Sequence, residues 1–194
     1  AALTSEVKAH GFFVAALPTL QDPEVKALFE ELRDEEVEHQ QLVKAEELQK
    51  EFTKALDARD TAKAVAAAGQ LANQAGDSFH ATAAAFAAAK AAFDTKDYAN
   101  ARQQLEWAFN KGQANLRPIA GLRLAQVLME EKKFDDALKI LDTIKDESYV
   151  ALVADTRGDV LMAKGSKDEA RMAWQTAVEK AGERSATKQA ALDA

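Results

Sequence analysis

Apolar residues recur along this chain at steps of three and four, the spacing that places them on one face of an α-helix. The longest run starts at Pro23 and continues to about Ala58 without an internal glycine or further proline. Asp22 is a suitable N-cap and proline suits the first helical position, so we predict that the helix begins there. Such a helix, about 35 residues long, far exceeds the usual 11–12. We therefore expect it to serve two packing units.

Shorter helices are predicted on either side of this long one. Thr4 or Ser5 can cap a first helix that runs to about Leu17, and further helices are predicted over residues 61–75 and 78–93. The chain is therefore predicted to be all-α.

From residue 94 onward, the turns between the helices recur at a regular interval. Residues 94–101, 130–137 and 163–170 are three versions of one polar turn, and their closing alanines are 36 and 33 residues apart. Twelve positions before each closing alanine stands a small residue, and four positions after it a bulky one: Ala89, Ala125 and Gly158, then Leu105, Leu141 and Trp174. A period near 34 with this alternation of size predicts a tetratricopeptide-like array of stacked helix pairs.

Residues from about 45 to 182 also resemble the YfgM family, the ancillary subunits of the bacterial Sec translocon. The resemblance is carried by Leu122-Arg-Leu-Ala125, Leu141-Asp-Thr-Ile-Lys145, Val153-Ala-Asp-Thr-Arg-Gly-Asp159, Lys164-Gly, Glu169-Ala-Arg171 and Ala173-Trp174. It implies a tetratricopeptide-like domain that lies in the periplasm and binds proteins. The implied partners are the translocon, periplasmic chaperones and emerging secretory chains. Members of that family carry a membrane anchor near the N-terminus, which residues 1–44 do not resemble.

Residues 1–44 carry a different pattern, a helical hairpin whose apolar seam is interrupted by charge. The seam residues are Leu3, Glu6, His10, Phe13 and Leu17 on the first helix, and Val25, Phe29, Leu32, Glu36, His39 and Val43 on the second. A carboxylate buried in a seam needs a counter-charge or a metal. Glu36 and His39 share one helical face, and Glu6 can face them across the hairpin. A Glu from one helix with a Glu-x-x-His pair from another is half of a ferritin-like di-iron site.

Residues 22–39 (DPEVKALFEELRDEEVEH) are similar to a rubrerythrin-type ferritin-like helix. The separation of Glu6 and Glu36 by 30 residues matches the two-helix encapsulated ferritins, although Phe13 stands where that family has a tyrosine. The resemblance implies that Glu6, Glu36 and His39 bind iron. Because a di-iron site takes two such sets, we predict a homodimer that pairs residues 1–44 into a four-helix bundle with iron at its interface. The alternative is that residues 33–38 form a solvated charged face.

Composition narrows the functional classes further. The net charge is −7 and no Lys/Arg cluster is present, which disfavours nucleic acid and anionic membranes as partners. The chain has no cysteine, which excludes disulfides and thiolate chemistry, and no apolar run long enough to span a bilayer. No Ser/His/Asp set or Gly-rich phosphate loop is present, so no catalytic residues are predicted. His80, Trp107 and Trp174 are interpreted as ordinary helix and packing residues.

These observations predict two units joined through one long shared helix: a ferritin-like hairpin over residues 1–44 and a tetratricopeptide-like domain over residues 45–194. The favoured function is a protein–protein interaction module, dimerised by the hairpin. One alternative is a ferritin-like iron-binding protein or ferroxidase with an appended repeat domain. Another is an engineered helical fusion without native function, which the lack of a Gly-, Pro- or Ser-rich linker between the units would fit.

Overall fold

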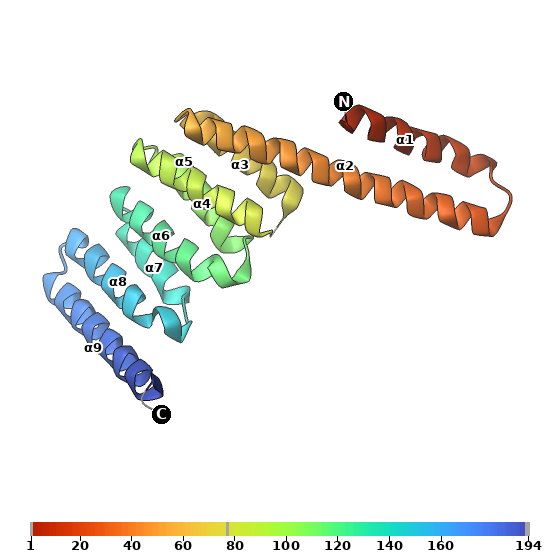
Figure 1. Ribbon diagram of the computed structural model, residues 1–194. Helices are drawn as coiled ribbons and strands as arrows, with labels where there is room; N and C mark the ends of the chain where they lie inside the picture. Colours follow the sequence, from red (N-terminus) through yellow and green to blue (C-terminus); the bar gives the residue numbers. More distant parts are fainter. Residues whose placement is uncertain (1, 77, 193–194) are drawn as a thin grey trace.

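The computed structural model describes the backbone of residues 2–76 and 78–192, and the side chains of residues 7–74, 76 and 78–182. Within these ranges every regular element is helical, which confirms the all-α prediction (Figure 1). The N-terminal hairpin consists of α1 (Ala2–Ala16), the short 3-10 turn η1 (Leu17–Thr19) and α2 (Pro23–Asp57). The helices that follow are α3 (Thr61–Ala75), α4 (Phe79–Asp94), α5 (Tyr98–Asn110), α6 (Arg117–Glu130), α7 (Phe134–Thr143), α8 (Val150–Lys164) and α9 (Lys167–Leu192).

The long helix α2 begins and ends where its sequence predicts. One carboxylate oxygen of Asp22 accepts hydrogen bonds from the backbone N–H groups of Glu24 (2.8 Å) and Val25 (3.3 Å), and Pro23 occupies the first position of the helix. Helix α1 differs from the prediction at its start. It begins at Ala2, so the two residues expected to cap it lie inside the helix.

Helices α2 to α9 form four stacked pairs (Figure 1). The last three pairs are α4 with α5, α6 with α7 and α8 with α9, as the recurring turns predict. The first pair is formed by the C-terminal half of α2 with α3. It lies within the repeat unit predicted over residues 45–194, although the pattern of recurring turns identified only the three later pairs. Ala64 is fully buried, like the closing alanines Ala101, Ala137 and Ala170 of the other three pairs. The array therefore starts inside α2.

The size of the residues that face each other within a pair explains why the first repeat is hard to recognise. In the middle pairs an alanine of the first helix faces a leucine of the second, as Ala89 and Leu105 do. In the first pair the sizes are exchanged, because Phe52 on α2 packs in one cluster with Ala68 on α3. The total volume stays similar, which is the property that a packed core requires.

The last pair keeps the order of the middle pairs in a more extreme form, with Gly158 on its first helix and Trp174 on its second. A Cβ atom built on Gly158 would lie 2.3 Å from Cδ1 and Nε1 of Trp174. The indole of Trp174 therefore occupies the space that a side chain at position 158 would need. Its Nε1–H also donates a hydrogen bond to Asp159 Oδ1 (3.2 Å).

The turn inside each pair uses one residue with a left-handed backbone. These residues are Arg59 (φ 55°), Lys96 (φ 62°), Lys132 (φ 61°) and Gly165 (φ 97°). In each case the backbone N–H of the next residue donates to the carbonyl five positions earlier, which is the Schellman closure of a helix C-terminus. Three of the four turns therefore place a long cationic residue in a conformation that favours glycine.

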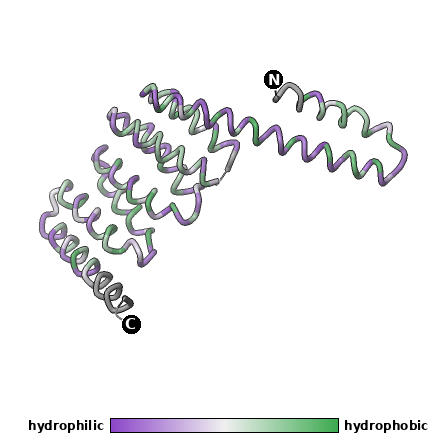
Figure 2. The backbone as a smooth tube through the Cα atoms, viewed as in Figure 1, coloured by the Kyte–Doolittle hydropathy of each residue, from purple (hydrophilic) through white to green (hydrophobic). Residues whose placement is uncertain are grey.

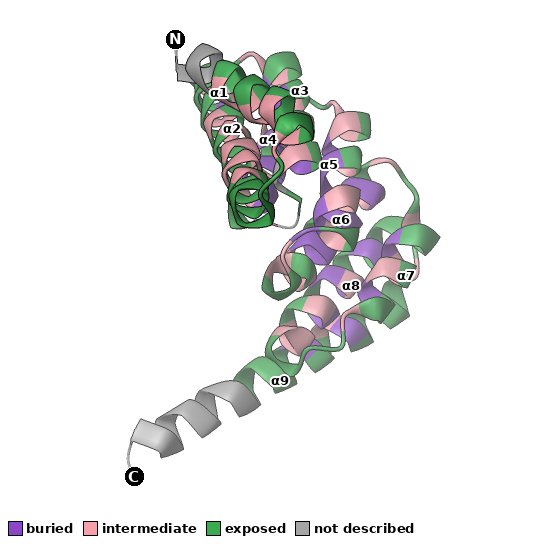
Figure 3. Ribbon diagram, turned by 90° about the vertical axis from the view of Figure 1, so that its right-hand side faces the viewer, coloured by how far each residue is buried: buried purple, intermediate pink, exposed green. Residues whose placement is uncertain are grey.

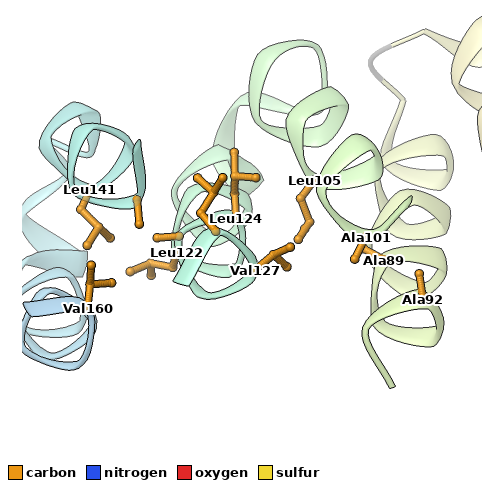
Figure 4. Packing of buried hydrophobic residues seen from close by; sticks show 12 residues of the cluster. Ala89, Ala92, Ala101, Leu105, Leu122, Leu124, Val127, Leu141 and Val160 are labelled. Carbon is orange, nitrogen blue, oxygen red and sulfur yellow. The ribbon is translucent and has the colours of Figure 1, made fainter. Parts of the chain in front are cut away.

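The hydrophobic core lies in the array and not in the hairpin. Its largest cluster runs from α4 to α8 and includes Leu105, Leu124, Leu141 and Val160 (Figure 4). Figure 2 shows hydrophobic and hydrophilic residues interleaved along α1 and α2. Among the described side chains, the first buried one is that of Phe52, so the outer part of the hairpin carries only exposed and half-buried residues (Figure 3). No helix in the described part of the chain has the length and hydropathy that crossing a bilayer requires.

Candidate protein-binding groove and helical hairpin

A cavity opens among α4, α5 and α6, where the second helix pair of the array meets the third. It has a volume of about 360 Å³. It is lined by Phe86, Ala89, Lys90, Phe93 and Asp94 of α4, Leu105 of α5, and Arg123, Gln126 and Val127 of α6. Ligand pockets of this kind usually start at about 300 Å³. We call this cavity the inner groove.

The inner groove combines an apolar floor with a charged rim. Leu105 and Val127 are each only 2% exposed and belong to the main core cluster (Figure 4). On the rim, Lys90 Nζ donates to Asp94 Oδ2 at 2.6 Å, so these two charges balance each other. The guanidinium carbon of Arg123 lies 4.8 Å from the centre of the Phe86 ring, a cation–π contact.

A second groove lies among α5, α6 and α7, and its charges are paired. It has a volume of about 400 Å³. Arg102 contacts Glu106 and Glu131, each at 3.0 Å, and the hydrogen bond to Glu106 raises the pKa of the guanidinium. Lys133 contacts the same Glu131 at 3.0 Å, and Lys139 contacts Asp136 at 2.9 Å. Because each of these cations has a carboxylate partner, this groove shows no excess of positive charge.

Further ion pairs connect the last two pairs of helices. Lys164 on α8 donates to Asp135 on α7 at 2.6 Å, and Arg157 donates to Asp142 at 2.5 Å. The hydrogen bond from Lys164 lowers the pKa of the Asp135 carboxyl below its ordinary value, and the same contact raises the pKa of Lys164. These two ion pairs link α7 with α8, so we assign them a structural role.

The residues predicted to bind metal lie on the hairpin. Glu6 is on α1, and its side chain lies outside the described residues. Glu36 and His39 are one turn apart on α2; Glu36 is half-buried and His39 is exposed, at the edge of the predicted seam. Among the described side chains no three His, Asp or Glu residues gather closely enough to hold a metal ion. Since Glu6 is not among them, the predicted set stays a prediction.

The seam between α1 and α2 is aromatic where the sequence predicts an apolar core. The rings of Phe13 and Phe29 pack edge to face with centroids 5.5 Å apart, and Phe12 adds a third ring, 5.5 Å from Phe13. Further along the seam, Oε1 of Glu36 is buried and accepts no hydrogen bond within the described structure. A buried carboxylate oxygen without a donor is costly.

The hairpin also exposes large apolar side chains to solvent. Those on its outer part are Val7, Phe12, Val14, Val25 and Leu28, which are between 39% and 62% exposed. The two tryptophans are half-buried, consistent with the packing role expected for them, and His80 is exposed beside Phe79. The contact of Arg123 with Phe86 was missed in the sequence, because it joins two helices whose register only the stacking sets.

Comparison with known proteins agrees with this architecture. A family model described as "Tetratricopeptide repeat-like domain" matches residues 35–194. The chain is 52% identical over 64 residues to the ancillary SecYEG translocon subunit of Escherichia coli (strain K12), covering 33% of this chain and 31% of that protein. It is 35% identical over 104 residues to the protein of the same name from Neisseria gonorrhoeae (strain ATCC 700825 / FA 1090), covering 53% of this chain and 50% of the relative. The matches thus span half or less of these relatives.

Solved structures support the fold alone. One crystal structure of MamA protein superposes with a TM-score of 0.58 at 17% identity, covering 94% of this chain and 93% of that one. A second MamA structure has a TM-score of 0.55 at 19% identity and covers 73% of this chain and 80% of the other. The ferritin-like resemblance of residues 1–44 finds no support in these comparisons. Because the repeat match takes in most of the chain, from the middle of α2 to the C-terminus, this protein belongs to the family of tetratricopeptide repeat-like domains and is a protein-interaction module.

Proposed function

We propose that this chain is the protein-binding repeat domain of a translocon-associated protein that works in the periplasm. The observation that carries the proposal is the 52% identity over 64 residues to a protein named as an ancillary SecYEG translocon subunit. The stacked pairs support it, since arrays of this type present an extended surface to peptides and partner helices. The inner groove lies on that surface and combines an apolar floor with a charged rim that carries one unpaired cation among the described residues.

Binding to purified partners tests this proposal. The full chain is immobilised and exposed separately to detergent-solubilised SecYEG, to purified periplasmic chaperones and to an unfolded secretory precursor. We expect saturable binding to at least one of them. A designed tetratricopeptide array of similar length and net charge serves as the control surface. Binding no stronger than to this control for all three probes would refute the translocon-associated assignment.

We further propose that the hairpin joins two copies of the chain. The five half-exposed apolar side chains of its outer part present on the order of 400 Å². A standard interface buries about 800 Å² per partner. The rest would come from polar surface, as it does in ordinary interfaces. Two hairpins packed together would complete a four-helix bundle, which gives each exposed apolar residue a neighbour.

A di-iron site in that bundle is the second candidate function. Glu6, Glu36 and His39 of each copy would hold the metal, and iron would supply redox chemistry with oxygen. The specific observation in its favour is the buried Glu36 Oε1, which has no hydrogen-bond donor in the described structure and would coordinate the metal ion. Light scattering with metal analysis tests both ideas. A metal-free monomer at pH 7 would exclude both the dimer and the di-iron site. Equal iron-dependent oxygen consumption by the chain and its Glu36→Ala variant would exclude the ferroxidase.

A further inference from the structure

We propose that the inner groove binds a partner segment in which a large apolar side chain stands next to acidic side chains, with Arg123 receiving a carboxylate. This rests on the proposed protein-binding function and specifies the chemistry of what is bound. The occupant is a peptide segment of another protein, and the residues around the cavity define both its charge and its apolar group.

The cavity requires an apolar group from the ligand. Its floor is made of core side chains, Leu105 and Val127, and its walls include the half-buried rings of Phe86 and Phe93. A volume of about 360 Å³ is sufficient for one large side chain and part of the backbone that carries it. A polar group placed there would lose its hydrogen bonds to water without replacement.

The rim requires a negative charge from the ligand. Lys90 is neutralised by Asp94, whereas Arg123 makes no ion pair with any described residue. Its contact with Phe86 holds the guanidinium over the ring and leaves the N–H groups at its edge available to a bidentate carboxylate. The rim therefore carries one uncompensated positive charge in a chain whose net charge is −7.

The two requirements apply to one short segment. Arg123 lines the same cavity as Phe93 and Leu105, so a single ligand meets the charge and the apolar floor at once. Since side chains only a few residues apart span such a distance, the acidic and apolar residues must be near neighbours in the partner sequence.

Four labelled peptides test this directly. They share Gly/Ser flanks, have capped ends, and differ only in a central Glu-Phe-Glu, Gln-Phe-Gln, Glu-Ala-Glu or Gln-Ala-Gln. Fluorescence anisotropy with the full chain measures each Kd. We expect Glu-Phe-Glu to bind about tenfold more tightly than Gln-Phe-Gln, the size of effect that one charge-assisted contact gives. The two alanine peptides should bind more weakly still.

Arg123→Gln should reduce the affinity for Glu-Phe-Glu to the level of Gln-Phe-Gln. Arg171→Gln is the matched control, because it removes one exposed cation from α9, away from the cavity. Equal Kd values for Glu-Phe-Glu and Gln-Phe-Gln, equal effects of the two variants, or no binding of any peptide would overturn the inference. Retention of SecYEG or a chaperone that Arg123→Gln leaves unchanged would also overturn it, while the proposed function would stand. Tight binding of the Glu-Phe-Glu peptide without retention of SecYEG, a chaperone or a secretory precursor would refute the proposed function and leave this inference standing.

Discussion

The fit of Trp174 over Gly158 predicts that alanine, the better helix former, destabilises the last helix pair. The added Cβ would lie 2.3 Å from two indole atoms and 2.8 Å from a third, so the ring or helix α9 must shift. Overpacking of this severity costs about 2–3 kcal/mol. The change from glycine to alanine inside α8 contributes about 1 kcal/mol of helix propensity in the opposite direction. The net expectation for Gly158→Ala is a loss of about 1–2 kcal/mol.

The other repeats suggest a second substitution that would compensate for Gly158→Ala. In the pair formed by α6 and α7 the equivalent residues are Ala125 and Leu141, both buried. Trp174→Leu alone should cost about 1–2 kcal/mol through the space it leaves. Gly158→Ala together with Trp174→Leu recreates the alanine–leucine combination, so the double variant should be close to the wild type. The two changes are therefore expected to couple by about 2 kcal/mol or more.

Hydrogen exchange measured by mass spectrometry on peptides from α8 and α9 is the appropriate assay. Repeat arrays open in parts, so a single global unfolding midpoint can hide a change in one pair. Peptides from α4 and α5 provide the internal reference. Slower exchange in α8 of Gly158→Ala would refute the predicted clash with Trp174. A double variant whose loss of stability equals the sum of the two single losses would refute it as well.

Three further predictions concern the turns, an ion pair and the hairpin. Lys132→Gly should stabilise the array by about 0.5–1 kcal/mol, because Lys132 holds a φ of 61°; an unchanged or lower urea midpoint would contradict this. Lys164→Met should lower stability at neutral pH, and the difference from the wild type should vanish as the pH falls through the lowered pKa of Asp135, and again as it rises through the raised pKa of Lys164. Urea midpoints measured across pH check it, and a constant difference would count against the pair. Asp22→Ala should cost the start of α2 about 1 kcal/mol, seen as faster exchange in its first turn.

The sequence predicted the features that depend on local chemistry. The start of α2 follows from a cap and a proline that act within four residues, and its length follows from the lack of a breaker. The repeated turns were recognised because each of them closes on an alanine, at an interval of 33 or 36 residues. The first repeat was missed because Phe52 and Ala68 exchange the sizes used elsewhere, and only the folded pair shows that the combined volume is kept.

Sequence patterns did not predict the features that depend on how the helices close and stack. Lys96 and Lys132 have no preference for a left-handed backbone, and the closure of the turn imposes it on them. The contact of Arg123 with Phe86 joins residues of different pairs, so its distance depends on the angle between them. For the predicted metal site, the half-buried position of Glu36 agrees with the seam pattern, whereas His39 lies further toward solvent.

The uninterrupted course of α2 fixes the rotational phase between the hairpin and the array. A helix turns by about 100° and advances about 1.5 Å with each residue. Two residues inserted between the two ends of α2 would therefore point the hairpin to roughly the opposite side. Seven would restore its direction to within about 20° and move it about 10 Å further out. The number of residues in α2 thus sets the direction in which anything attached to the hairpin points relative to the repeats.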